Sequence, residues 1–260
     1  MIKLAFISPI SYLRAFSLLG DIEFALAHIA LKSKEYREYF YQVAHLGRFV
    51  ILDNGAFEEG DPVTQENLLE LVTEMRPSEI IAPDKLHRAK ETIDLTLAFL
   101  DSLPEHFPSK VQAVAQGETF EAFKECYYMW LCDPRVHTIG VPFHLDYWQL
   151  SESPTKNMYL NRTKAIEILN ECFSPGKPHH CLGMSDPIEL SILKKFSFIR
   201  SCDSTSAFVH GARGIRYTEE GLPGEKLSSK LDFNFSEALS IKQQKDIRYN
   251  IGKLKEFVVQ

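Results

Sequence analysis

Residues 49–60 read FVILDNGAFEEG, and this stretch carries the clearest signal for the fold. Four apolar residues at 49–52 are followed at once by Asp53, by small residues and by the aromatic Phe57. A short apolar run that stops at a turn is typical of a buried strand in a parallel sheet. The stretch therefore predicts a buried strand at 49–53 whose carboxyl end presents a carboxylate.

Short apolar runs like this one recur along the chain. They occupy residues 2–8, 24–31, 49–53, 79–84, 111–117, 137–142, 179–184 and 197–203. Helical apolar spacing lies between them at residues 64–76, 88–103, 119–131, 162–173 and 186–196. Strands that alternate with helices predict a parallel sheet, and eight of them would close a (β/α)8 TIM-type barrel of the α/β class. The run at 24–31 is the least distinct, because residues 21–40 also read as one helix; a doubly wound open sheet is the alternative.

Length and composition are consistent with one barrel domain spanning residues 1–260. We expect its core at 1–216, followed by a C-terminal loop and helix at 217–260. The net charge of -6 disfavours a dedicated nucleic-acid module, which would be more basic. The five cysteines form no C-x-x-C pair, which fits a reducing cytoplasm. No apolar run approaches the length of a membrane span, so no membrane partner is expected.

Polar and small residues gather where the predicted strands end. The set comprises Asp53, Asp84, Gln116, Gly117, Gly140, Gly183 and Asp203. Any one aspartate could equally cap the next helix. Because a (β/α)8 barrel places its active site at the carboxyl ends of its strands, the whole set predicts one pocket.

Five motifs, in order over residues 49–214, resemble those of the tRNA-guanine transglycosylases and their relatives that act on guanine in DNA. DNGAFE at 53–58 is similar to the family's DSGGFQ, VAQGE at 114–118 to VQGG, and IGVP at 139–142 to IGGL. CLGMSDP at 181–187 is similar to LMGVG, and RSCDSTSAF at 200–208 to FDCVLPTR. Asn54, Ala56 and the residues at 206–208 depart from the family pattern, and its zinc motif, C-x-C-x-x-C with a later His, is absent.

The resemblance implies catalytic roles for two aspartates. Asp203 corresponds to the nucleophile that forms a covalent glycosyl-enzyme, and Asp53 would be its proton-transfer partner. Asp84, in IIAPDK, matches the aspartate that accepts the N1–H and amino group of guanine. Gln116 would bind the O6 and N7 side of the base.

The remaining base-binding residues shape the pocket around the flat base. Main chain near Gly140 would reach O6, while Phe57 and Leu182 would sandwich the base. The alternative for both residues is ordinary core packing, which Leu182 taken by itself favours. Gly117 and Gly183 complete the predicted base-binding set. No cofactor and no metal is implied.

Basic side chains and potential metal ligands elsewhere in the sequence have more than one interpretation. His210, Arg213 and Arg216 could hold substrate phosphates, or could form a solvated helix face. His179, His180 and Cys181 are adjacent, but no further ligand lies at metal spacing, so we expect no site there. His144 and Asp146 follow a strand end and are candidates for substrate contact.

The resemblance therefore implies a pentosyltransferase that replaces guanine in a polynucleotide with a free 7-deazaguanine base. The absence of the zinc segment favours DNA over tRNA as the substrate. In this respect the chain resembles the compact relatives found in phages, which would work in the host cytoplasm. A tRNA enzyme, a glycosidase that cleaves a nucleoside with water, and a non-catalytic nucleobase-binding barrel are the alternatives.

Overall fold

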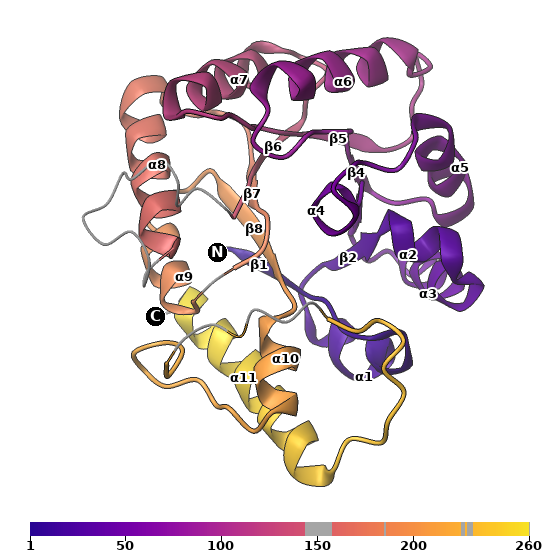
Figure 1. Cartoon of the computed structure of the whole chain (residues 1–260), viewed down its shortest axis with the longest axis vertical. Coiled ribbons are helices and arrows are strands. Elements are labelled where there is room, and N and C mark those ends of the chain that lie inside the picture. Colours follow the sequence, from indigo (N-terminus) through magenta and orange to yellow (C-terminus); the bar gives the residue numbers. More distant parts are fainter. Residues whose placement is uncertain (144–157, 185, 225–226, 228–230, 260) are drawn as a thin grey trace. The chain divides into compact units, whose positions relative to one another are not determined.

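The computed structural model describes residues 1–143, 158–184, 186–224, 227 and 231–259. These residues form a (β/α)8 TIM-type barrel with a C-terminal helix (Figure 1). Its strands are β1 (Lys3–Phe6), β2 (Glu23–Leu26), β3 (Val50–Asp53), β4 (Glu79–Ile81), β5 (Lys110–Val114), β6 (Thr138–Val141), β7 (His179–Cys181) and β8 (Ile199–Ser204).

The strand order is β1-β8-β7-β6-β5-β4-β3-β2. From β2 to β8 each strand lies beside its neighbour in sequence, β1 lies beside β8, and β1 and β2 stand at the two ends of the order. A doubly wound sheet would instead reverse its order at a switch point, so that alternative is excluded. The registered pairs are parallel, with Leu26 opposite Asp53, Val114 opposite Gly140, and Ala5 opposite Asp203.

Helices follow the strands, and those at 65–75, 89–102, 120–132, 158–173 and 188–193 lie where the apolar spacing predicted them. They are α1 (Leu13–Phe16), α2 (Ala27–Lys32), α3 (Lys34–His45), α4 (Ala56–Glu59), α5 (Gln65–Met75), α6 (Ala89–Ser102), α7 (Phe120–Cys132), α8 (Met158–Phe173), α9 (Ile188–Leu193), α10 (Ser206–Ala212) and α11 (Ile241–Val259), with short 3-10 turns η1 (Ile10–Tyr12) and η2 (Ser17–Leu19). Within the part of the chain described, none of the helices combines the length and apolar character needed to cross a membrane.

The chain divides into two compact units, which are described separately below. Unit 1 comprises Met1–Asp21, Phe143–Ser174 and Cys181–Gln260. Unit 2 comprises Ile22–Pro142 and Pro175–His180.

Helix α7 of unit 2 buries one face. In α7 the fully buried side chains are Phe123, Cys126, Tyr127 and Trp130, which recur at the spacing of one helical face. Thr119 caps the same helix by accepting a hydrogen bond of 3.1 Å from Ala122 N. Burial of this apolar stripe therefore fixes the helix against the sheet, and the cap fixes where it begins.

The second strand exists but is shorter than predicted. β2 ends at Leu26, and residues 27–31, expected to extend it, belong to α2. The one-helix interpretation of residues 21–40 is also wrong, because Ser33 separates α2 from α3 and accepts a hydrogen bond from Tyr36 N at 3.2 Å. The strand is held by pairing with β3 and by buried Glu23, which Arg48 Nε contacts at 2.7 Å. Because the local apolar pattern of this segment suits both a strand and a helix, these long-range partners decide that residues 23–26 form a strand.

Candidate functional site

A buried cluster of one carboxylate and two amides lies in unit 2, where β3, β4 and β5 end. Asn54 Nδ2 donates to Asp84 Oδ1 at 2.7 Å, and Gln116 Nε2 donates to Asp84 Oδ2 at 2.8 Å. Asp84 is only 4% exposed, and Asn54 and Gln116 are more deeply buried still. The structure thus brings together two sequence-predicted residues, Asp84 and Gln116, and adds Asn54 as a second amide donor to Asp84.

Burial changes the acidity of this carboxyl group. Removal from water raises the pKa of Asp84, while the hydrogen bonds from Asn54 and Gln116 oppose that rise. The net direction is upward. Asp84 is therefore an acceptor whose charge costs free energy until further donors stabilise it.

The turn after β3 explains the small residues of the DNGAFE motif. Gly55 has φ of 78°, a left-handed conformation that glycine adopts readily. A Cβ there would also lie 3.0 Å from His28 Nδ1. Asp53 Oδ2 accepts from Gly55 N at 2.9 Å, and Asn54 Oδ1 accepts from Ala56 N at 2.8 Å. Asp53 therefore stabilises the turn that follows its strand. This local structural role is separate from the catalytic role implied by the resemblance.

Phe57 lies in the short helix α4 that this turn begins. Its side chain is 52% exposed, so it is not part of the packed core of unit 2. An exposed aromatic ring close to the carboxyl end of a buried strand is compatible with stacking on a flat ligand.

Gln116 is fixed at both ends of its amide. Besides donating to Asp84, its Oε1 accepts from His87 N at 3.1 Å, and His87 has a positive φ of 61°. The next residue, Gly117, supports α7, because a Cβ there would lie 2.3 Å from Phe123 N. In the adjacent strand, Gly140 O accepts from Ala115 N at 3.0 Å. Gly117 thus has a packing role, and Gln116 is oriented before any ligand binds.

Unit 1 holds the predicted nucleophile. Asp203 lies in β8, is 6% exposed, and its Oδ1 accepts a hydrogen bond of 2.8 Å from Gly183 N. Gly183 has a positive φ of 65°, and Leu182 is half-buried. The residues that the sequence placed after β7 and in β8 therefore meet within this unit.

A buried arginine holds the Leu182–Gly183 main chain in place. Arg162 Nη1 donates to Leu182 O at 2.8 Å and Nη2 donates to Gly183 O at 2.7 Å. The same guanidinium forms a bidentate pair with Glu189, with Nε to Oε1 at 2.6 Å and Nη2 to Oε2 at 2.8 Å. Both side chains are fully buried. Arg162 therefore fixes the carbonyl groups on either side of the N–H that binds Asp203.

The three residues predicted to contact phosphates differ in exposure. His210 is 1% exposed; its Nδ1 lies 2.8 Å from Ser206 O, and Leu227 N lies 3.4 Å from its Nε2. These contacts suit a neutral ring that donates through Nδ1 and accepts through Nε2. Arg213 and Arg216 are exposed. Of these three residues, only the two arginines are exposed enough to reach a polyanion.

The adjacent histidines after α8 are core residues. His179 Nδ1 lies 2.9 Å from Lys177 O and its Nε2 lies 2.9 Å from the Tyr127 hydroxyl, and burial lowers the pKa of His179 to about 4. His180 stacks on Phe24 with ring centroids 5.5 Å apart. Among the described residues, no group of three or more His, Cys, Asp or Glu side chains is placed to hold a metal ion.

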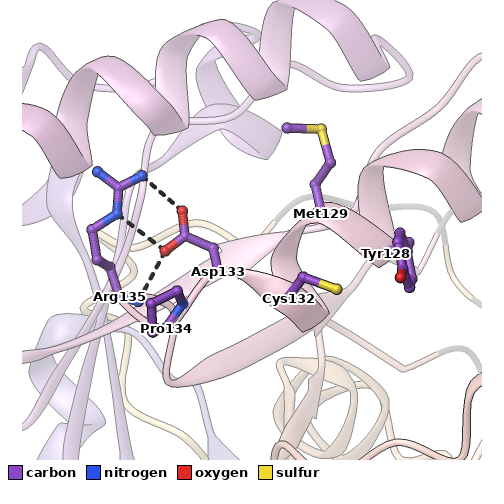
Figure 2. A pocket seen from close by; sticks show the side chains of 6 residues that line it. All are labelled: Tyr128, Met129, Cys132, Asp133, Pro134 and Arg135. Carbon is purple, nitrogen blue, oxygen red and sulfur yellow. Dashed lines mark hydrogen bonds and ion pairs between the residues drawn. The ribbon is translucent and has the colours of Figure 1, made fainter.

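A cavity of about 450 Å³ lies at the C-terminal end of α7 and contains none of the predicted site residues (Figure 2). It is lined by Tyr128, Met129, Cys132, Asp133, Pro134 and Arg135. Arg135 binds Asp133 through Nε and Nη2 at 3.0 and 2.7 Å and also binds Asp101. Its charge is thus already compensated, so the cavity offers no evident anion site.

Two features of the site were missed by sequence reasoning. Asn54 stands out in the sequence only as a departure from the family motif, and apolar spacing does not predict that Arg162 pairs with Glu189. A charged residue in the otherwise apolar face of a predicted helix was the available signal for Arg162. His144 and Asp146, the other candidates for substrate contact, lie outside the described residues.

A scan against protein-family models finds no match to the chain, and a search of curated proteins finds no similar sequence. The class that the structure defines is a (β/α)8 barrel with a buried carboxylate–amide cluster beyond its strands β3, β4 and β5. The resemblance to the transglycosylases is carried by the motifs quoted above.

Proposed function

We propose that this protein is a base-exchanging pentosyltransferase that replaces guanine in DNA with a free 7-deazaguanine base. The observation that carries the proposal is the buried Asp84 carboxylate, oriented by the amides of Asn54 and Gln116. The strand-end motifs that resemble the guanine transglycosylases supply the reaction class.

Asp84 suits a base edge with two parallel donors. Each of its oxygens accepts one amide hydrogen bond, and a carboxylate oxygen can accept a second. Guanine and 7-deazaguanine both offer N1–H and a 2-amino group side by side. A base without these donors would leave a buried carboxylate poorly solvated, and polar pockets of this kind discriminate by about 10⁴–10⁵-fold.

Asp203 is assigned the covalent step. Its carboxylate attacks C1′ of the nucleotide, the C1′–N9 bond breaks, and the guanine that leaves with the electron pair takes up a proton. The incoming base then loses its N9 proton and attacks C1′, and the C1′–O bond to Asp203 breaks. Asp53 carries the proton in both directions, so the exchange needs no oxidant, reductant or cofactor.

The Gly183 N–H supports this assignment. It donates to Asp203 Oδ1 at 2.8 Å, which orients the carboxylate and stabilises its negative charge. In duplex DNA the target nucleotide would be flipped out of the stack before reaction, since the sugar carbon is otherwise inaccessible.

The test compares single-stranded DNA, duplex DNA and tRNA, each carrying labelled guanine, with and without a 7-deazaguanine acceptor. We expect label to leave DNA only when the acceptor enters it. Asp203→Asn should abolish exchange, whereas Asp94→Asn, which changes an exposed aspartate on α6, should leave it intact.

Other outcomes would point to the alternatives. Release without incorporation of the acceptor would identify a glycosidase, and exchange in tRNA alone would identify a tRNA enzyme. Base binding with no release from any polymer, unchanged by Asp203→Asn, would leave a nucleobase-binding barrel and overturn the proposal.

A further inference from the structure

The C-terminal helix α11 and the loop before it carry a concentration of exposed positive charge in unit 1. We call this the basic face; it comprises Arg213, Arg216, Lys242, Lys245 and Arg248. The protein as a whole has a net charge of -6, so the basic face is local and does not reflect a generally cationic surface.

Residues 212–217, where this loop begins, are fastened to α11 by side chains of the helix. Gln243 Nε2 donates to Ala212 O at 2.7 Å. Asn250 bridges two further points of the loop, donating to Ile215 O at 2.9 Å and accepting from Tyr217 N at 2.9 Å. The arginines of the loop are therefore held alongside the lysines of the helix.

Among the described residues, an acidic side chain pairs with one of these five cations and leaves the others unpaired. Arg216 Nε binds the buried Asp246 at 2.6 Å, and its guanidinium lies 4.9 Å from the ring centroid of Tyr249, which is 43% exposed. Among the residues that the structure describes, Arg213, Lys242 and Lys245 form no ion pair. An exposed tyrosine that contacts an arginine, on a helix that also carries unpaired lysines, is a combination that suits single-stranded nucleic acid.

The basic face is rigidly connected to the strand that holds Asp203. Helix α10 begins directly after β8 and packs along α11 (Figure 1). The contact is close, because a Cβ at Gly211 would lie 2.6 Å from Ile247 Cα. The position of the basic face is thus fixed relative to β8 by main-chain packing.

We propose that the basic face binds the sugar-phosphate backbone of the polynucleotide substrate, with Tyr249 as a surface for an unpaired base. The inference rests on the proposed function in that the substrate is taken to be a polymer. An anionic membrane is disfavoured because the apolar side of α11, including Ile247, Ile251 and Leu254, is buried.

The experiment measures binding of single-stranded DNA to the full chain as a function of salt. Lys242→Gln, Lys245→Gln and Arg248→Gln are combined in one variant. The matched control combines Lys90→Gln, Lys110→Gln and Lys195→Gln, three exposed lysines elsewhere, so that net charge changes equally. A third variant keeps the charges by Lys242→Arg, Lys245→Arg and Arg248→Lys.

We expect the first variant to bind more weakly and to lower the slope of log K against log salt by about 2, since each contact to single-stranded DNA contributes about 0.7. The control and the charge-conserving variants should retain the wild-type slope. Equal loss in the control and basic-face variants would overturn the proposal, as would wild-type binding to phosphatidylserine vesicles but not to DNA. Binding is measured without base exchange. A failed exchange assay would therefore count against the proposed function, whereas only the binding assay tests the basic face.

Discussion

Asn54 Nδ2 lies 2.7 Å from Asp84 Oδ1 and 2.7 Å from Ala82 O, so one amide group ties the turn after β3 to the segment after β4. Its Oδ1 accepts from Ala56 N at 2.8 Å. Both donor hydrogens and the acceptor of Asn54 are therefore used. This residue links the geometry of the DNGAFE turn to the orientation of the carboxylate proposed to recognise the base.

Replacing Asn54 should damage both stability and base binding. Asn54→Ala leaves Asp84 and the Ala56 N–H short of a partner in a buried environment, which costs about 1–3 kcal/mol of unfolding free energy per unsatisfied group. Urea denaturation measures the loss, and calorimetry measures affinity for 7-deazaguanine. Asn67→Ala, on α5, is the control and should change neither by much; equal behaviour of the two variants would contradict the role of Asn54.

Base binding should depend on the ionisation of Asp84. Burial raises the pKa of Asp84 above its ordinary value of 3.8, and only the ionised form can accept two donors from the base. Affinity is therefore present at high pH and is lost as pH falls through the raised pKa, at a pH above 3.8. Titration of affinity against pH tests this. A loss centred at or below 3.8, or the same pH profile in Asp84→Asn, would refute it.

The Arg162–Glu189 pair allows stability to be separated from activity. Arg162→Met or Glu189→Leu alone leaves a buried, uncompensated charge and should cost about 3–5 kcal/mol. The double variant removes both charges and should be more stable than either single variant. It still lacks the donors to Leu182 and Gly183, so base exchange should stay low.

Two measurements check this expectation. Urea denaturation gives the unfolding free energies, and the amide proton shift of Gly183 reports its hydrogen bond to Asp203 without any substrate. Arg135→Met, which breaks a surface pair with Asp133, is the control and should cost no more than about 1 kcal/mol. A double variant with wild-type exchange and an unchanged Gly183 shift would show that Arg162 is only structural.

Gly117 should tolerate no side chain. Gly117→Ala places a Cβ 2.3 Å from Phe123 N in the main chain of α7, so the helix must move. Overpacking of this kind costs about 1–3 kcal/mol or more. Gly176→Ala is the matched control, because a Cβ there meets nothing within 4 Å. Thermal unfolding of the two variants should differ clearly; similar midpoints would contradict the close packing of α7 on Gly117.

Much of the fold could be predicted from apolar spacing. The stretches predicted as helices at 64–76 and 119–131 correspond to α5 and α7, because their buried faces repeat with the helical period. The stretch at 24–31 could not be resolved in this way. Its alanine and leucine residues suit a helix as well as a strand. Pairing with β3 makes the part up to Leu26 a strand, and the rest belongs to α2.

The sequence by itself determined the alternation of strands and helices and the small set of polar residues placed where strands end. It did so because side-chain periodicity and turn residues are local properties. The tertiary structure alone decided that Asn54 holds Asp84, 30 residues away, and that Arg162 pairs with Glu189, 27 residues away. Such contacts depend on strand order and helix packing, so the orientation of each site residue follows from the folded chain and not from the motif that contains it.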